Sequence, residues 1–576
     1  MNTFYIYIKR YYKPFLIAIS CLIIEIFCDL MQPTIMSKVV DIGVKNKDIN
    51  YVINMGGLMV LITIIGALGA TGRNILSVNV SQSFASDLRM DLFKKVNSFS
   101  FKTLDNFTTS SLVTRLTNDV TQVQNFVNGL MRIFVKAPLI GIGAIIMASR
   151  LNPPMSIILL LIVPIIVLII FMNMRISYPF FIKIQGALDR INGVMREYLG
   201  GVRVVKAFNR FDYEKERFGH CNEELTTLSK TAMRINALFS PGISLTVNLA
   251  IVVVLWMGGN RVNNGTMEVG QVIAFTNYMT QILFSLMMIS HVFNMFIKAR
   301  ASAKRIEEVL KEDSSHESDK ENTDISNLQG NIEFNNVCFS YFDNSEEWVI
   351  KNITFKAKAK ETIGIIGATG AGKTTLVNLI PGFYNPSLGS IKIDGVNINN
   401  MDHKILRDHI AIVPQKTMLF TGSIKDNILW GKENASSQNI NEAASIAMAH
   451  EFIINTKDGY DTILGRGGVN LSGGQKQRVS IARALIKKPK ILILDDCTSA
   501  LDTLTENKIR EGLKSYLGEV TTFIISQKIT SVMEADKIMV IDNGEIVGMG
   551  VHKDLIENCS VYKEILNSQL GKEVVN

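Results

Sequence analysis

Six apolar stretches in the first half of the chain are each about as long as a helix that crosses a membrane. Crossing the ~30 Å hydrocarbon core of a bilayer takes about 20 helical residues. The stretches cover residues 14–36, 52–72, 131–149, 154–174, 240–259 and 269–296. The first continues well past the length of a signal-peptide core, so we expect it to be retained as a span. The sequence therefore predicts an all-α membrane domain that crosses the bilayer six times.

Basic residues at the two ends of this region predict its orientation. Six spans place both ends on the same side of the membrane. The flanking basic residues are Lys9, Arg10 and Lys13 before the first span, and Lys298, Arg300 and Lys304 after the sixth. Because positive charge accumulates in cytoplasmic segments, this side is expected to be cytoplasmic. Both termini and the C-terminal half are then cytoplasmic in a multi-pass protein.

The connections on the cytoplasmic side are unusually long. Residues 73–132 and 175–237 interleave charged and apolar residues and contain little proline. Long water-exposed helices have this pattern. We therefore expect helices that extend far beyond the membrane, with tips near residues 101–111 and 208–218.

Length and composition agree with a membrane half followed by a soluble half. A chain of 576 residues exceeds what one hydrophobic core supports, and 47% hydrophobic residues is high for a soluble protein. The net charge of +8 could indicate nucleic-acid binding, but the basic residues lie beside the apolar spans. We therefore expect contact with membrane lipid and not with nucleic acid. The six cysteines lack metal-ligand or redox spacing and are expected to be reduced thiols.

The chain divides into three segments. Residues 1–310 form the membrane domain, residues 311–328 are too polar to bury a core and form a linker, and residues 329–576 form a soluble domain. In the last segment, apolar runs alternate with helical stretches, which is typical of an α/β fold. The expected strands include residues 362–366, 410–413, 491–494 and 522–525.

A phosphate-binding motif follows the first of these expected strands. Residues 367–374 read GATGAGKT and match G-x-x-x-x-G-K-[ST] between a strand and an apolar helix. Glycines let backbone amides wrap the phosphates, Lys373 can reach the β and γ phosphates, and Thr374 can offer its hydroxyl to Mg²⁺. The expected ATP contacts are Gly367, Thr369, Gly370, Ala371, Gly372, Lys373, Thr374 and Thr375.

Two further motifs lie between this loop and the end of the chain. The strand at residues 491–494 ends in Asp495, an acidic residue placed to bind Mg²⁺. A glycine-rich LSGGQ sequence precedes it and consists of Leu471, Ser472, Gly473, Gly474 and Gln475. With this signature, the chain resembles ATP-binding cassette (ABC) exporters of the bacterial multidrug type over nearly its whole length.

The resemblance implies a type I exporter fold, a bacterial cell membrane location and several site roles. It implies that Tyr341 stacks on adenine and that Gln415 contacts Mg²⁺ and senses the membrane domain. Residues 499–502, SALD, match the D-loop, with Ser499 and Asp502 at its ends. The internal tips near residues 104–111 and 209–216 are implied to form short helices seated on the cassettes, the second on the opposite chain. The alternative is that these tips are solvated helix ends.

The resemblance also implies a partner. Two cassettes of this family meet head to tail, and each ATP lies between the phosphate loop of one chain and the signature of the other. By that rule Ser472, Gly473 and Gly474 contact the γ phosphate of ATP held by a second half-transporter chain.

Two residues depart from the family pattern at catalytic positions. Asp496 stands where the general base is a glutamate, and Gln527 stands where the switch residue is a histidine. A carboxylate about 1 Å out of place can lose ~10²-fold in rate. Glutamine donates a hydrogen bond but lacks the charge of a protonated imidazole. The pair resembles the degenerate-site subunit of heterodimeric exporters, with weak hydrolysis at its own site; the alternative is neutral drift.

The membrane half offers candidates for a substrate path. Glu25 and Asp29 lie one helical turn apart in the first span, a costly placement unless they face a cavity or a partner. The alternative is a structural polar contact, or an interfacial position for Asp29. The sixth span is rich in methionine and aromatic residues, including Phe284 and Met288, which can pack around varied apolar ligands or simply against neighbouring helices. The expected cargo is a small amphipathic drug-like molecule or a lipid.

Two other functional classes are compatible with the same residues. One is an ATP-gated regulatory or channel-type ABC protein, and the other is an importer built on the exporter fold. The sequence offers no regulatory insert in support of the first, and the direction of transport separates the second from an exporter.

Overall fold

The structure, a computed structural model, describes residues 2–312, 328–341 and 347–570. The expected linker at residues 311–328 lies almost entirely outside the described residues. The chain forms two compact units, one from residues 1–95 and 109–312, the other from residues 96–108 and 313–576. A short piece of the first internal loop thus belongs to the second unit.

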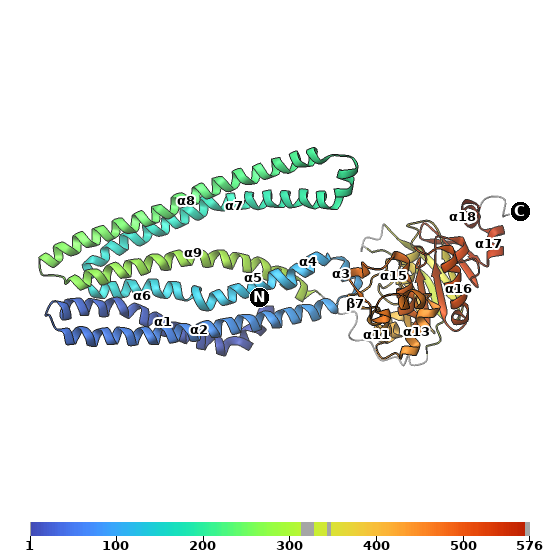
Figure 1. Cartoon of the computed structure of the whole chain (residues 1–576), viewed down its shortest axis with the longest axis horizontal. Coiled ribbons are helices and arrows are strands. Elements are labelled where there is room, and N and C mark those ends of the chain that lie inside the picture. The colour runs from blue at the N-terminus through green and yellow to red at the C-terminus, as the bar shows by residue number, and fades with distance from the viewer. Residues whose placement is uncertain (1, 313–327, 342–346, 571–576) are drawn as a thin grey trace. The chain divides into compact units, whose positions relative to one another are not determined.

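The first unit is all-helical (Figure 1). Its long helices are α1 (Asn2–Lys38), α2 (Ile49–Asn97), α6 (Lys136–Leu151), α7 (Ser156–Ala207), α8 (Phe211–Asn263) and α9 (Val269–Lys311). Shorter elements are η1 (Val39–Val44), α4 (Thr109–Thr114), η2 (Arg115–Asp119), α5 (Val120–Gly129), η3 (Leu130–Phe134) and η4 (Pro153–Met155). Six helical segments of the described chain are long and apolar enough to cross a membrane. The predicted membrane domain is confirmed.

Apolar side chains in this unit face outward, as lipid contact requires. Leu160 and Leu161 on α7 are 74% and 65% exposed. The buried interior instead contains small residues such as Ala144 and Ala148 packed near Phe275 and Tyr278. Small side chains let helix backbones approach closely where no water drives association.

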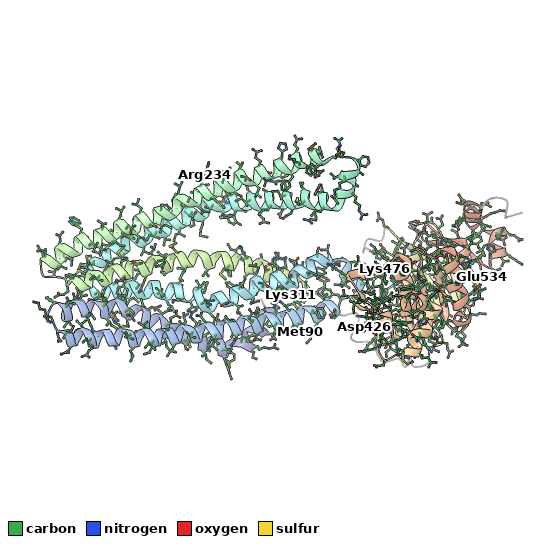
Figure 2. The ribbon with its side chains drawn as sticks, viewed as in Figure 1. Met90, Arg234, Lys311, Asp426, Lys476 and Glu534 are labelled. Atoms are coloured by element: carbon green, nitrogen blue, oxygen red, sulfur yellow. The ribbon has the colours of Figure 1, made fainter. Side chains whose placement is uncertain are left out.

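The long internal segments are helical, as the sequence predicts. Figure 1 shows α7 and α8 side by side as one long hairpin. Ion pairs between charged side chains link the two helices along their polar part, including Arg190 with Glu224 and Arg217 with Glu197. Figure 2 shows the side chains of both helices, with Arg234 labelled on α8. This part of the hairpin has the surface of a water-exposed helix pair.

The second unit is an α/β domain built on three sheets. The main sheet has the order β12-β11-β3-β10-β9-β6, with β12 antiparallel to β11 and the other pairs parallel. Its strands are β3 (Thr362–Ile366), β6 (Ile410–Val413), β9 (Ile491–Asp495), β10 (Thr521–Ile525), β11 (Lys537–Asp542) and β12 (Glu545–Gly550). All four strands expected from sequence are present.

An antiparallel sheet of order β2-β1-β4-β5 and a small β7–β8 pair complete the strands. Their bounds are β1 (Ile332–Phe339), β2 (Ile350–Ala357), β4 (Leu388–Ile393), β5 (Val396–Asn397), β7 (Gly422–Ser423) and β8 (Ile463–Leu464). The helices of eight or more residues are α13 (Ser437–Ile446), α15 (Gly473–Leu485), α16 (Thr503–Leu517) and α18 (Ser560–Leu570). Shorter helices are α3 (Phe101–Asp105), α10 (Lys373–Asn378), α11 (His403–Asp408), α12 (Ile424–Leu429), α14 (His450–Ile454) and α17 (His552–Asn558). The 3₁₀ turns are η5 (Ile398–Asn400), η6 (Gly459–Asp461), η7 (Arg466–Gly468) and η8 (Ile529–Ser531).

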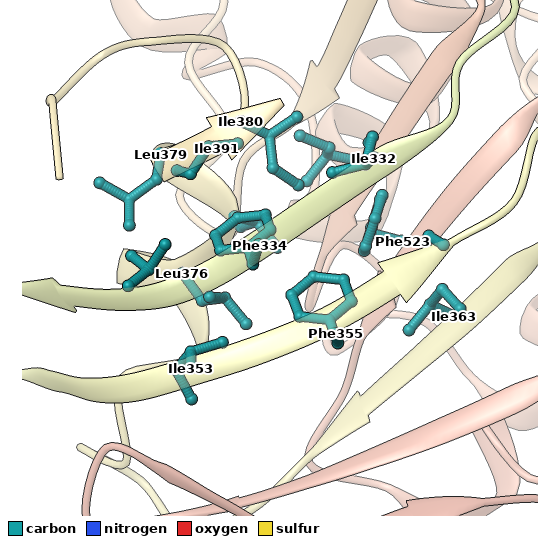
Figure 3. Close-up of a cluster of buried hydrophobic side chains, with 14 of the residues drawn as sticks. Ile332, Phe334, Ile353, Phe355, Ile363, Leu376, Leu379, Ile380, Ile391 and Phe523 are labelled. Atoms are coloured by element: carbon teal, nitrogen blue, oxygen red, sulfur yellow. The ribbon is translucent and has the colours of Figure 1, made fainter. Parts of the chain in front are cut away.

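A buried aromatic core joins the two larger sheets (Figure 3). Phe334 of β1 stacks on Phe355 of β2 at 4.6 Å between ring centroids, and Phe355 meets Phe523 of β10 edge-on at 6.4 Å. Leu376 of α10 packs into the same cluster. The strand and the helix that flank the phosphate-binding loop are therefore anchored in one core.

The parallel strands end at a common edge. Ile365 of β3 pairs with Ile525 of β10, which pairs with Asp495 of β9. Ligands of open parallel sheets bind outside the carboxyl ends of the strands. This register brings the segments after β3, β6, β9 and β10 together at one site.

Candidate functional site

The loop between β3 and α10 has a backbone that favours glycine. Gly372 has φ +96°, and an added Cβ would lie 2.9 Å from Ile350 Cδ1 and 3.0 Å from the Val349 carbonyl oxygen. At Gly367 an added Cβ would lie 2.0 Å from the Ile541 carbonyl oxygen. Side chains at either position would distort the loop. The two glycines thus set the path of the chain into Lys373.

Lys373 and Thr374 begin α10 at the centre of the site. Lys373 is buried, and its Nζ donates to the carbonyl oxygens of Gly367 at 2.8 Å and Ala368 at 2.7 Å. Burial lowers the pKa of Lys373, although the carboxylates of Asp496 and Asp495 act in the opposite direction. The Thr374 hydroxyl donates to Asp495 Oδ2 at 2.9 Å. Burial raises the pKa of Asp495.

One pocket of about 220 Å³ collects most of the expected nucleotide residues. It is lined by Val349, Thr369, Gly370, Gly372, Lys373, Thr374, Thr375, Gln415, Asp495, Asp496, Ile525 and Gln527. Thr374, Gln415 and Asp495 offer it a hydroxyl, an amide oxygen and a carboxylate, the oxygen ligands that suit Mg²⁺. Both departures from the family pattern, Asp496 and Gln527, line the same pocket. The structure therefore brings the phosphate loop and the altered positions together.

Asp496 has a left-handed backbone with φ +44°. Its amide donates to the Ile525 carbonyl oxygen at 2.9 Å, and its carboxylate accepts from Gln415 Nε2 at 3.2 Å. Asp is more often found in this backbone region than longer side chains because its short polar group bonds locally. Backbone conformation thus favours aspartate at this position independently of catalysis.

The loop that carries Gln527 is held from two sides. Gln569 of α18 donates from Nε2 to the Gln527 carbonyl oxygen at 2.7 Å and accepts from the Ile529 amide at 2.8 Å. On the other side, Glu506 of α16 accepts from Lys528 at 3.2 Å and from the Thr498 hydroxyl at 3.1 Å. Sequence reasoning missed Glu506 and Gln569, because no local motif marks their contacts with this loop.

The signature residues lie at the N-terminus of α15, outside the lining of this pocket. Ser472 caps the helix: its hydroxyl accepts from the Gln475 amide at 3.3 Å, and Gln475 Oε1 accepts from the Ser472 amide at 2.9 Å. Ser472 and Gly473 are exposed. The positive end of the helix dipole is therefore open to an anion from outside the chain.

The D-loop is tied to the signature helix. Gln477 of α15 donates to the Ser499 hydroxyl at 3.3 Å and accepts from the Ala500 amide at 3.1 Å. Asp502 caps α16 by accepting from the Thr505 amide at 2.9 Å, and this bond lowers the pKa of Asp502. Signature and D-loop thus form one connected surface.

Tyr341 contacts the end of the phosphate loop and a second tyrosine. Its hydroxyl pairs with the Thr375 hydroxyl at 3.0 Å, and its ring meets Tyr384 edge-on at 5.2 Å. Thr375 itself lines the pocket. The expected adenine residue is therefore bonded to the end of the phosphate loop.

The two internal tips differ. The first contains α3, capped by Ser100, whose hydroxyl accepts from the Thr103 amide at 3.2 Å. Residues 209–216 do not form a separate short helix, because the chain turns at Asn209, with φ +50°, and residues from Phe211 onward already belong to α8. The side chains of Phe208, Phe211 and Tyr213 are exposed.

Glu25 and Asp29 have different surroundings in the membrane unit. Glu25 is buried and pairs with Arg73 of α2 at 2.7 Å and Lys136 of α6 at 2.5 Å. Asp29 lies 3.4 Å from Lys136, and its side chain is 47% exposed. The contacts support the structural alternative for Glu25 and leave Asp29 accessible. Phe284 and Met288 are also exposed on α9.

The comparisons with known proteins agree with this geometry. Residues 15–287 match the ABC transporter transmembrane region, and residues 350–499 match the ABC transporter domain. The uncharacterized ABC transporter ATP-binding protein YfiB of Bacillus subtilis is 41% identical over 97% of this chain and 96% of its own length. This chain belongs to the ABC transporters. It is a half-transporter with a multi-pass membrane domain and an ATP-binding domain, as the sequence predicts.

Other relatives cover most of the chain. An uncharacterized ABC transporter ATP-binding protein of Mycobacterium tuberculosis is 34% identical over 98% of this chain and 97% of its own length. The ATP-dependent lipid A-core flippase of Desulfotalea psychrophila is 34% identical over 86% of both chains. The solved structure of a bacterial Atm1-family ABC exporter with ATP bound matches with TM-score 0.81 at 24% identity, over 98% of this chain and 99% of the other. That likeness confirms the exporter fold.

Proposed function

We propose that this ABC transporter is one subunit of a heterodimeric ATP-driven exporter in the bacterial cell membrane. Its own ATP site binds nucleotide and hydrolyses it slowly, and its signature completes the hydrolytic site of a partner half-transporter. The observation that carries the proposal is the single pocket in which Asp496 and Gln527 stand beside Lys373, Thr374 and Asp495.

The pocket supports nucleotide binding better than bond cleavage. Lys373, now bonded to loop carbonyl oxygens, is placed to turn toward phosphate, and Thr374, Gln415 and Asp495 can hold Mg²⁺. When bound, Mg²⁺ neutralises charge on the phosphates. The Asp496 carboxylate is one methylene shorter than glutamate and is shared with the Gln415 amide. Gln527 can orient a water molecule but supplies no positive charge.

The exposed end of α15 supports the role of a partner. Ser472 and Gly473 are exposed and do not line this chain's own pocket. A second cassette facing this surface would place its ATP against the helix N-terminus, where backbone amides favour anions. The intact LSGGQ is consistent with a partner that carries out hydrolysis.

The α7–α8 tip supports a second contact with the partner. Phe208, Phe211 and Tyr213 are 76%, 58% and 59% exposed at a turn that lies outside the membrane spans. Aromatic side chains of this kind commonly anchor protein interfaces. In our proposal they seat on the cassette of the partner chain.

The proposed cargo is a small amphipathic molecule or a lipid. A flippase for lipid A-core is among the relatives. Asp29, Phe284 and Met288 give the membrane unit an accessible carboxylate and soft apolar surface. In the proposed orientation both termini and the nucleotide-binding domain are cytoplasmic, as the flanking basic residues indicate.

Comparing ATP turnover by the chain alone and by the reconstituted pair tests the division of labour. We expect slow turnover by the chain alone, fast turnover by the pair, and slow turnover again when the partner's catalytic glutamate is changed to glutamine. Turnover by the chain alone at the rate of the pair would refute the proposal. ATP-dependent accumulation of cargo in inverted vesicles separates an exporter from an importer, and an ATP-gated current would indicate a channel.

A further inference from the structure

An aromatic cluster in the second unit connects the expected adenine residue with α3 of the first internal loop. Tyr384 lies between them. Its ring meets Tyr341 edge-on, with centroids 5.2 Å apart and planes at 88°, and its hydroxyl donates to Asp105 Oδ2 at 2.7 Å. The two bonded residues, Asp105 and Tyr384, are separated by 279 positions in sequence.

The Tyr341 end of the cluster is fixed to the phosphate loop. Its hydroxyl pairs with the Thr375 hydroxyl at 3.0 Å, one residue beyond Thr374. Its ring also packs edge-on against Phe339 of β1 at 4.9 Å. A base that stacks on Tyr341 would press on a ring that already touches Tyr384, so the two tyrosines cannot reorient independently.

At the Asp105 end of the cluster, the donor is the Tyr384 hydroxyl, which stays protonated. Burial, followed by the hydrogen bond to Asp105, raises the pKa of Tyr384 above its ordinary range. Hydrogen bonds to a carboxylate are about twice as strong as neutral ones. The Tyr384 hydroxyl is therefore a donor to Asp105 at neutral pH.

A separate apolar contact docks α3. Phe101 packs on Phe383 with centroids 4.3 Å apart, and Phe383 lies beneath the Arg407 guanidinium at 5.5 Å. This contact does not involve Tyr341. Phe101 also meets the Tyr384 ring, with centroids 6.1 Å apart. The two rings dock α3 together, and the hydroxyl of Tyr384 adds the bond to Asp105.

We propose that Tyr384 is a positioning residue that couples adenine occupancy of this chain's own ATP site to the docking of α3. The proposal rests on the proposed function in one respect, the role of Tyr341 as the adenine platform. In the chain, α3 lies between α2 and α4, both of which belong to the membrane unit. A nucleotide that is retained and not hydrolysed can then still set the state of the first internal loop.

Coupling of this kind is reciprocal. If adenine favours docked α3, then docked α3 favours adenine by the same factor, which is typically 5-fold to 150-fold. Cutting the Tyr384–Asp105 bond should weaken ATP binding by at least about 5-fold. Inorganic triphosphate, which lacks a base, should bind equally well before and after the change.

Two variants of the full-length chain in nanodiscs test the coupling. Tyr384→Phe keeps the ring and removes only the hydroxyl, and Asp105→Asn keeps the shape of the acceptor and removes its charge. We expect each to weaken ATP but not triphosphate, and the double variant to be no weaker than the stronger single variant, since both cut one bond. Tyr516→Phe is the matched control, because its hydroxyl donates to the Leu485 carbonyl oxygen at 3.2 Å outside this cluster.

Hydrogen exchange of residues 96–108 provides a readout that a purely structural role would not change. In the unaltered chain, ATP should slow exchange in this segment, and in Tyr384→Phe it should no longer do so. An equal response to ATP in Tyr384→Phe would overturn the coupling. Tyr341→Ala separates the two failures: unchanged ATP affinity would overturn the adenine assignment and the coupling with it, whereas weakened affinity with an unaffected Tyr384→Phe would overturn the coupling alone.

Discussion

Replacing Glu25 with glutamine should destabilise the membrane unit more than any other removal of a single charge in the first span. The Glu25 carboxylate pairs with Arg73 and Lys136, whose side chains are only 7% and 18% exposed. Glutamine fills the same volume but removes the counter-charge of the buried Arg73 and leaves Lys136 with the half-exposed Asp29. Removing one partner of a buried ion pair costs about 3–5 kcal/mol.

Thermal unfolding in detergent measures this loss. At about 2 °C per kcal/mol for a unit of this size, Glu25→Gln should lower Tm by roughly 6–10 °C. Asp29→Asn is the matched control. Asp29 is half-exposed and lies 3.4 Å from Lys136, which still pairs with Glu25 in this variant. A partly exposed pair of this kind contributes at most about 1 kcal/mol.

A charge-balanced variant separates pairing from general damage. Glu25→Gln with Arg73→Gln removes one charge of each sign and leaves Lys136 beside Asp29, so much of the lost stability should return. The reasoning fails if Glu25→Gln and Asp29→Asn melt at the same temperature, or if the double variant is less stable than Glu25→Gln. Transport by Asp29→Asn, measured in the same preparation, then tests its role in the substrate path.

Three further predictions follow from the cassette and the α7–α8 tip. Gly372→Ala forces a side chain into a left-handed position against Val349 and should cost about 1–3 kcal/mol, with loss of the Tm increase that ATP gives the unaltered chain; an unchanged ATP-induced increase would contradict this. Partial burial raises the pKa of Asp394, but hydrogen bonds from the backbone amides of Gly330, Asn331 and Gln329 and from the Asn331 side chain outweigh it and lower the pKa. Its stabilising contribution is therefore present above the unfolded pKa of about 3.9 and lost as pH falls through the lower folded value; Asp394→Asn should cost about 1.5–3 kcal/mol at pH 7 by denaturant unfolding, and a pH-independent difference down to strong acid would argue against it. Phe208→Asp at the exposed tip should change the free energy of unfolding by no more than about 0.5 kcal/mol. The same change should abolish cargo-stimulated ATP turnover by the pair. Full stimulation would exclude this tip from the interface.

The sequence predicts the parts of the site that depend on local order. Residues 362–366 form β3, the GATGAGKT loop follows, and Lys373 begins a helix, because short motifs and apolar runs determine these elements. Parallel strand order then brings Asp495 and Gln527 to the same edge. Six apolar stretches likewise suffice to predict six spans, since their length is compared with a fixed bilayer thickness.

Contacts between distant residues are what the sequence alone does not predict. Glu25 is visible as a costly charge, but its partners Arg73 and Lys136 lie on other helices. Gln569 contacts the Gln527 loop across 42 positions. The break at Asn209 depends on one left-handed residue, which is why a separate helix at residues 209–216 was expected and is not formed. In each case tertiary packing decides between local alternatives of similar energy.

The backbone at Asp496 has a consequence for the proposed slow hydrolysis at this site. A glutamate introduced there would inherit a torsion angle of +44°, which long side chains seldom adopt, and would have to displace the Gln415 amide to reach a water molecule. A glutamate at this position would thus meet both a strained backbone and the existing bond with Gln415. In the proposed heterodimer, this backbone would act against reversion of Asp496 to glutamate by a single substitution.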